Sequence, residues 1–256
     1  MRSMTVDGVR LAYRLDGDDL SPTIVLVNSL GTDLRMWNPQ VDALSRHFRV
    51  LRYDIRGHGQ SGLSDEEVTI ERLGLDLMDL LDELSIRSVH ICGLSLGGMI
   101  ALWLAIHHPE RIKRAVFANT AARIGTIEGW NARIGAVEAG GMAAVRETVV
   151  ARFLSEGFRA RHPETTRWVG DMLEATNPEG YIEVCAALRE ADLSQLIHKI
   201  RVPSLILTGS LDEATPPVQA EQLHKAIPGS ELIIFPEVAH LSNVELPDAF
   251  NACLLS

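Results

Sequence analysis

A serine flanked by glycines, in the run C-G-L-S-L-G-G at 92–98, is the part of this sequence best suited to chemistry. An apolar, strand-like segment precedes it and a helix-like segment follows. This is the pattern G-x-S-x-G between a strand and a helix, in which the glycines permit a sharp turn that exposes the serine hydroxyl. Unpaired N–H groups at the start of the helix favour negative charge beside that hydroxyl. We therefore predict that Ser95 is a nucleophile, rather than an idle residue in a glycine-rich turn.

A serine hydroxyl is a weak nucleophile at neutral pH, so it needs a base, and the base needs an acid that orients it. On this kind of turn the acid and the histidine follow the serine in that order along the chain. Asp212 comes just after the apolar run L-I-L-T-G, and His240 comes after the run E-L-I-I-F. Both positions follow late strands of the predicted sheet, so we predict the trio Ser95, Asp212 and His240. Glu213 is the alternative acid, but the distance from the strand end favours Asp212.

An oxyanion intermediate would need N–H donors close to the serine. One donor normally comes from the residue after the nucleophile, here Leu96, and the second from a loop after an early strand. The loop N-S-L-G at 28–31 occupies that place, and the Leu30 N–H is the predicted second donor. Ser29 adds a hydroxyl beside it and is either a substrate contact or only a turn residue. A second glycine-rich loop, R-G-H-G-Q-S at 56–61, lacks the Lys-Ser/Thr pair of a phosphate-binding loop, so we expect Arg56 to anchor loops.

Composition restricts the class of protein. The chain has 256 residues, of which 46% are hydrophobic and 23% charged, as is ordinary for a globular protein, and its formal net charge is −10. A negative net charge disfavours nucleic-acid and anionic-membrane partners, which need a basic surface. The three cysteines do not suggest a disulfide framework, and no metal-ligand spacing is present. The sequence starts without an apolar signal segment and contains no apolar run of membrane-spanning length, so we expect a cytoplasmic protein.

Strand-like and helix-like segments alternate up to about residue 120 and resume near residue 200. The strand-like runs lie at 23–28, 48–54, 88–92, 114–119, 203–209 and 231–235, and the helix-like runs between them include 36–46, 69–84 and 96–107. Such alternation predicts an α/β fold with a mostly parallel sheet flanked by helices. The stretch between has helical pieces but no apolar strand run. We predict a core of residues 1–120 and 197–256 with an inserted helical cap at 121–196; the alternative is that these helices pack on the flank of the sheet.

These motifs together resemble the α/β-hydrolase superfamily along essentially the whole chain. The segments R-G-H-G-Q-S, G-L-S-L-G-G and the strand that ends at Asp212 are common to many of its members. More specific segments resemble the 3-oxoadipate enol-lactonases. They are N-S-L-G-T-D-L-R-M-W at 28–37, T-A-A-R-I-G-T-I-E-G-W at 120–130, D-E-A-T-P-P at 212–217 and A-H-L-S-N-V-E at 239–245. The resemblance implies a serine esterase that needs no cofactor or metal and opens a small anionic lactone in the bacterial breakdown of aromatic compounds.

The acetate arm of such a lactone requires a cation or hydrogen-bond donors, because a buried unpaired carboxylate is costly. We single out Arg133, which lies one helical turn from Trp130 on the same predicted face, and Trp130 as a wall for the lactone ring. The candidates for this role are seven arginines of the predicted cap: Arg123, Arg133, Arg146, Arg152, Arg159, Arg161 and Arg167. The motifs are also compatible with three other functions on the same fold, namely a carboxylesterase, a carbon–carbon bond hydrolase or a ligand receptor. A haloalkane dehalogenase is disfavoured, since its nucleophile would be an aspartate at position 95.

Overall fold

The computed structural model describes all residues from 1 to 256, and eight strands form a single sheet in the order β1-β2-β4-β3-β5-β6-β7-β8. β2 pairs antiparallel with β1 and with β4, and every pairing from β4 to β8 is parallel. The predicted mostly parallel sheet is therefore confirmed. The strands are β1 (Arg2–Val6), β2 (Val9–Asp16), β3 (Thr23–Val27), β4 (Arg49–Tyr53), β5 (Val89–Leu94), β6 (Ile112–Ala118), β7 (Ser204–Gly209) and β8 (Glu231–Phe235).

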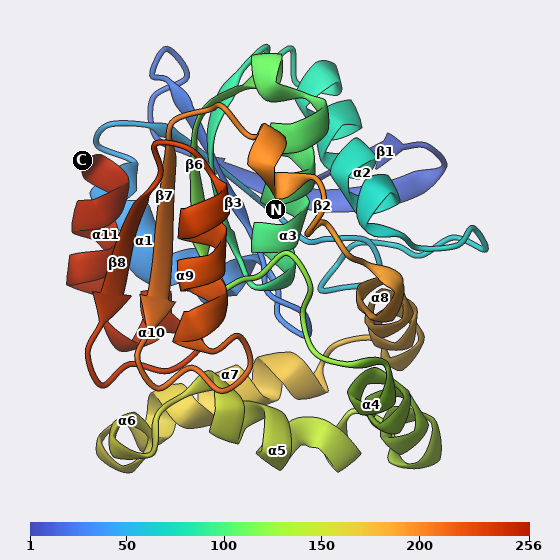
Figure 1. Ribbon diagram of the computed structural model, residues 1–256. Coiled ribbons are helices and arrows are strands. Elements are labelled where there is room, and N and C mark those ends of the chain that lie inside the picture. Colours follow the sequence, from blue (N-terminus) through green and yellow to red (C-terminus); the bar gives the residue numbers. More distant parts are fainter.

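Helices flank this sheet (Figure 1). α1 packs against α11, α2 packs against α3, and α9 lies against β7 and β8. The helices of this flanking set are α1 (Asn38–Leu44), α2 (Ile70–Glu83), α3 (Leu96–His107), α9 (Pro217–Ala226), α10 (Ser242–Glu245) and α11 (Pro247–Leu255). Three short 3-10 turns complete the set: η1 (Leu34–Trp37), η2 (Pro109–Arg111) and η3 (Ile197–Lys199).

The local sequence explains why the central strands form. All five residues of β3 are buried, as expected for a parallel strand that is covered on both faces. At the N-terminus, Asp7 and Gly8 both have positive φ, at 44° and 73°, which joins β1 to β2 in the tight hairpin that an Asp-Gly pair predicts. The helix expected at 36–46 instead starts with the turn η1 and continues as α1, because Pro39 favours the first turn of a new helix.

Five helices occupy the long insertion between β6 and β7, and we refer to residues 127–190 as the α4–α8 segment. They are α4 (Ile127–Gly140), α5 (Ala143–Phe153), α6 (Glu156–Arg161), α7 (Pro163–Glu174) and α8 (Pro178–Glu190). Pro163 and Pro178 separate helical pieces, and each begins a helix, where its missing N–H costs nothing. The short helix α6 has no periodic pattern that predicts it, and Ser155 caps it by accepting a hydrogen bond from the Phe158 N–H at 3.2 Å.

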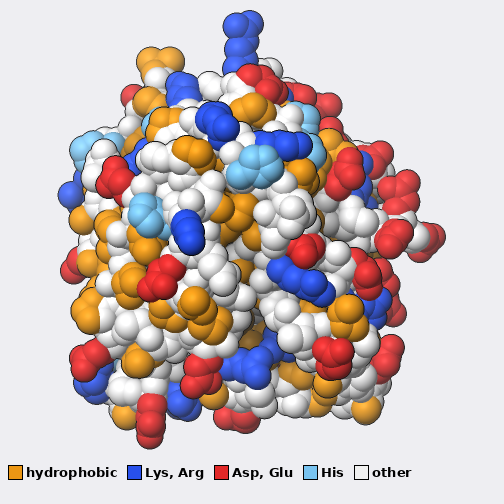
Figure 2. Space-filling model, in the orientation of Figure 1, with side chains coloured by type: hydrophobic (Ala, Val, Ile, Leu, Met, Phe, Trp, Pro, Cys, Tyr) orange, Lys and Arg blue, Asp and Glu red, His pale blue; other side chains and the backbone are white.

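The α4–α8 segment lies beyond the carboxyl ends of the parallel strands, with α4, α5, α6 and α7 along the lower edge of Figure 1. One continuous hydrophobic core of 77 buried residues includes side chains from both the sheet and this segment. No helix is long and apolar enough to span a bilayer. Acidic and basic side chains are interspersed over the face shown in Figure 2, which also has a hollow near its lower centre.

Candidate active site

Ser95 sits on the turn between β5 and α3, with φ 60° and ψ −116°, a conformation that L-residues rarely adopt. The turn is possible because its neighbours have no side chains. A Cβ at Gly93 would overlap the Gly97 carbonyl, and a Cβ at Gly97 would overlap the Val27 carbonyl. The Ser95 N–H donates to the Ala118 carbonyl at 2.9 Å, which fixes the turn against β6. The strained turn predicted from the pentapeptide is therefore present.

The structure brings Asp212 and His240 together, although 28 residues separate them in the chain. Nδ1 of His240 lies 2.8 Å from Oδ2 and 3.0 Å from Oδ1 of Asp212. Because a carboxylate can only accept, the proton lies on Nδ1, and Nε2 is left as a base. Glu213, the alternative acid, is exposed and makes no contact of this kind with His240.

The Asp212 carboxylate is held by several donors besides His240. It accepts from the N–H groups of Ala214 and Thr215, both at 2.9 Å, and from the Thr215 hydroxyl at 2.8 Å. Asn119 Nδ2 also donates to Oδ2 at 2.9 Å. Burial acts to raise the pKa of Asp212, but the charge and hydrogen bond of His240, together with these donors, outweigh it and lower the pKa. Asp212 therefore stays ionised and orients the imidazole.

Asn119 is a site residue that the sequence analysis missed. It follows β6 directly, has φ 46°, and bonds both Asp212 and the Ala239 carbonyl, the latter at 3.2 Å. It thereby ties the loop after β7 to the loop after β8. Asp212 was predicted because it is a polar residue that follows a parallel strand at its carboxyl end. Asn119 follows β6 in the same way, so the same rule could have identified it.

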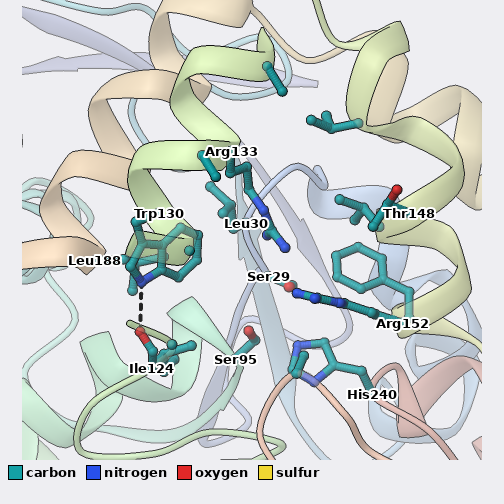
Figure 3. A pocket seen from close by; sticks show the side chains of 18 of the residues that line it. Ser29, Leu30, Ser95, Ile124, Trp130, Arg133, Thr148, Arg152, Leu188 and His240 are labelled. Atoms are coloured by element: carbon teal, nitrogen blue, oxygen red, sulfur yellow. Dashed lines mark hydrogen bonds between the residues drawn. The ribbon is translucent and has the colours of Figure 1, made fainter. Parts of the chain in front are cut away.

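Ser95 and His240 both line a cavity of ≈ 370 Å³ between the sheet edge and the α4–α8 segment (Figure 3). The structure has no hydrogen bond between the Ser95 hydroxyl and the imidazole, and such bonds are often long in proteins without substrate. The ring of Phe153, from α5, stacks on the His240 ring at 5.5 Å between centroids. The imidazole is thus fixed on one side by Asp212 and on one face by an aromatic ring.

Of the two predicted oxyanion donors, one is on the residue after Ser95 and the other is on a residue that lines the same cavity as Ser95. Leu96 is the first residue of α3, so its N–H lies outside the hydrogen-bond ladder of the helix. The Leu30 N–H has no hydrogen-bond acceptor within the protein, and Leu30 lines the cavity. Ser29 lines it too, and its hydroxyl is fully buried without a hydrogen-bond partner. A buried hydroxyl without a partner is unusual and marks a place where a ligand could bond.

Trp130 and Arg133 both line the cavity from α4, as the one-turn spacing predicts. The Arg133 guanidinium lies over the Trp130 ring, 5.1 Å from its centroid. The indole N–H donates to the Ile124 carbonyl at 2.7 Å, so the ring is held in place. Arg152, which the sequence analysis did not distinguish from the other arginines of this region, also lines the cavity.

The remaining lining is mostly apolar or small. It consists of Ile124, Gly125, Thr126, Gly129, Ala132, Ala136, Ala144, Val145, Thr148, Val149, Leu188 and Ala214. Arg56 lies outside this set, and it bonds Asp76 at 2.7 and 2.9 Å and Ser64 at 2.5 Å. The prediction that Arg56 anchors loops is therefore confirmed.

Known proteins resemble this chain in both sequence and structure. The sequence profile of a family described as alpha/beta hydrolase fold matches residues 22–247. The chain is 40% identical to 3-oxoadipate enol-lactonase 1 of Acinetobacter baylyi, with 95% of this chain and 91% of the relative covered. 3-oxoadipate enol-lactonase 2 of the same organism is 37% identical, with 97% and 93% covered. The crystal structure of the enol-lactonase from Burkholderia xenovorans LB400 superposes with a TM-score of 0.97 and 42% identity, covering 99% and 98% of the two chains.

Proposed function

Because this chain belongs to the α/β-hydrolase family, we propose that it opens 3-oxoadipate enol-lactone to 3-oxoadipate through a serine acyl-enzyme. The observation that carries the proposal is the hydrogen-bonded pair of Asp212 and His240, because His240 lines the same cavity as Ser95 and the only charged residues lining that cavity are arginines. Such a cavity suits a small anion that must be attacked by a hydroxyl. The names of the relatives supply the identity of that anion.

Acylation uses the turn at Ser95. Nε2 of His240 accepts the hydroxyl proton as Oγ attacks the ring carbonyl, and Asp212 stabilises the imidazolium that forms. The N–H groups of Leu30 and Leu96 receive the oxyanion of the tetrahedral intermediate, each contributing about 3 kcal/mol to lowering the barrier. The bond from the acyl carbon to the ring oxygen then breaks, and its electron pair leaves as an enolate. An enolate is a weaker base than an alkoxide, so it needs little help from an acid.

Deacylation reverses the roles. The enolate becomes the ketone by taking up a proton at carbon, which uses the proton that His240 removed from Ser95 and returns the imidazole to its neutral form. A water molecule attacks the acyl carbon while His240 removes its proton, and Ser95 leaves as the hydroxyl. The net reaction consumes one water and releases one proton, and the monoanionic lactone becomes a dianion with two carboxylates.

Binding of the acetate arm falls to the α4–α8 segment. Arg133 is our proposed partner for the carboxylate, and the flat face of Trp130 is the proposed wall for the lactone ring. Ser29 belongs to the loop at 28–31 and has an unpartnered hydroxyl that can donate to the substrate. The proposal includes residues 121–196 as a cap that covers the core of residues 1–120 and 197–256 and supplies these contacts.

The test is a spectroscopic assay with authentic enol-lactone. We expect the purified protein to abolish the ultraviolet absorbance of the enol-lactone, with kcat/KM above that for aryl esters and for diketones cleaved at a carbon–carbon bond. A protein that hydrolyses those alternatives while leaving the enol-lactone absorbance unchanged would contradict the proposal. A Ser95→Ala variant that retains every biological effect of the protein would instead favour a receptor.

A further inference from the structure

Two arginines enter the same cavity from different helices. Arg133 comes from α4 and Arg152 from α5, and Figure 3 shows both guanidinium groups pointing inward above Ser95 and His240. No other charged residue lines the cavity. A substrate with one carboxylate requires only one of these cations.

Neither guanidinium is neutralised by the protein. Neither Arg133 nor Arg152 has an ion pair, whereas Arg146, on the same helix as Arg152, pairs with Glu147, Asp171 and Glu174 at 2.9 to 3.1 Å. Burial raises the pKa of the Tyr181 hydroxyl, and the charges of Arg133 and Arg152 act in the opposite direction. Arg133 is half-buried and Arg152 is exposed to solvent, so both unpaired guanidinium groups are open to an anionic ligand in the cavity.

The two arginines occupy different positions relative to the reacting serine. Arg133 lies over Trp130, which lines the part of the cavity formed by α4. Arg152 immediately precedes Phe153, whose ring stacks on His240. In Figure 3 its guanidinium extends between Ser29 and His240. Arg152 is therefore the cation on the side of the imidazole, where the new carboxyl group forms.

We propose that Arg152 binds the carboxylate that ring opening creates, while Arg133 binds the carboxylate already present, so that the site is complementary to a six-carbon dicarboxylate. The inference rests on the proposed function, because it uses the charge of that reaction. The lactone enters with one carboxylate and the product leaves with two. The reaction thus supplies one anion for each arginine, and the product should bind more tightly than its monoanionic analogues.

The experiment compares two probes of the same length, adipate with two carboxylates and adipamate with one carboxylate and one amide. Isothermal titration calorimetry with the unmodified protein should show adipate binding at least ~10-fold more tightly, as expected for one additional charge-assisted hydrogen-bonded pair. Arg152→Gln should remove most of this preference and leave the affinity for adipamate within about two-fold. Arg152→Lys, which keeps the charge but not the planar fork, should retain part of it.

A matched control is Arg167→Gln, which removes the same charge from an exposed position on α7 outside the cavity. It should leave the preference for adipate unchanged. An equal loss of adipate and adipamate affinity in Arg152→Gln, or no loss of either, would overturn the assignment.

The same proteins separate this inference from the proposed function. If the protein turns over the enol-lactone and the preference for adipate is unchanged in Arg152→Gln, only the proposed role of Arg152 is wrong. If the protein does not turn over the enol-lactone but its preference for adipate over adipamate still depends on Arg152, only the proposed substrate is wrong. The cavity is then still a site for two carboxylates.

Discussion

The two walls of the cavity are built differently. On the sheet side, Asp212 accepts four hydrogen bonds besides that from His240, and Asn119 connects two loops. On the side of the α4–α8 segment, Arg133 and Arg152 have no ion pairs. Several hydrogen bonds within the protein fix the orientation of the groups that would move protons. The charged groups that would recognise a substrate have no ion-pair partner in the protein and are free to bind it.

This difference has a physical reason. A general base must keep one orientation and one tautomer through the reaction, and each additional hydrogen bond to Asp212 restricts the imidazole further. A recognition cation that already had a carboxylate partner would have to lose it before binding substrate. Changes on the sheet side should therefore affect kcat, while changes on the other side should affect KM and the choice of substrate.

The largest effect is expected on the sheet side. Ser95→Ala and His240→Ala should each lower kcat by ~10³-fold or more, because the nucleophile or its base is lost. Circular dichroism should show an unchanged fold, and His198→Ala, at an exposed histidine outside the cavity, is the control. Losses below ten-fold in both variants would remove the proposed trio.

Asn119→Ala should have the next largest effect, with kcat reduced by about 100-fold or less. Its hydrogen bond helps to lower the pKa of Asp212, so removing it raises that pKa. The fraction of ionised Asp212 then falls at a higher pH than in the unmodified protein. The acidic limb of the kcat profile should accordingly shift toward higher pH, and an unshifted profile would leave Asn119 with a purely structural role.

Arg133→Gln tests the other wall. KM for the anionic lactone should rise by ~10-fold or more, because a charged hydrogen-bond partner of the carboxylate is lost. KM for a neutral aryl ester should change little, and kcat should remain close to that of the unmodified protein. If both substrates were affected equally, Arg133 would act by shaping the cavity rather than through its charge.

The smallest effect is expected at Ser29, which lines the cavity from the loop after β3. Ser29→Ala should lower kcat/KM by less than about ten-fold, the size of one neutral hydrogen bond to the substrate. Thermal unfolding should be unchanged or occur at a slightly higher temperature, since a buried hydroxyl without a partner is removed. Unchanged kinetics together with reduced stability would identify Ser29 as a turn residue.

Several features of the site could be predicted because their signals are local. The glycines around Ser95 report a backbone turn, and the positions of Asp212 and His240 after late strands follow from the topology of a parallel sheet. The spacing of Trp130 and Arg133 places them on one helix face. The helix α6 was missed because six residues are too short to show a periodic pattern.

The sequence by itself therefore determined the alternating α/β layout and the turn at Ser95, and it predicts the chain order of the proposed trio, since each depends on neighbours in the chain or on a general rule of sheets. Only the tertiary structure decided that Asn119 reaches Asp212 across 93 residues and that Phe153 stacks on His240. It also decided which arginines of the α4–α8 segment face the cavity. Helical periodicity determines which residues share one face of a helix. The direction in which that face points depends on how the helix packs against the sheet.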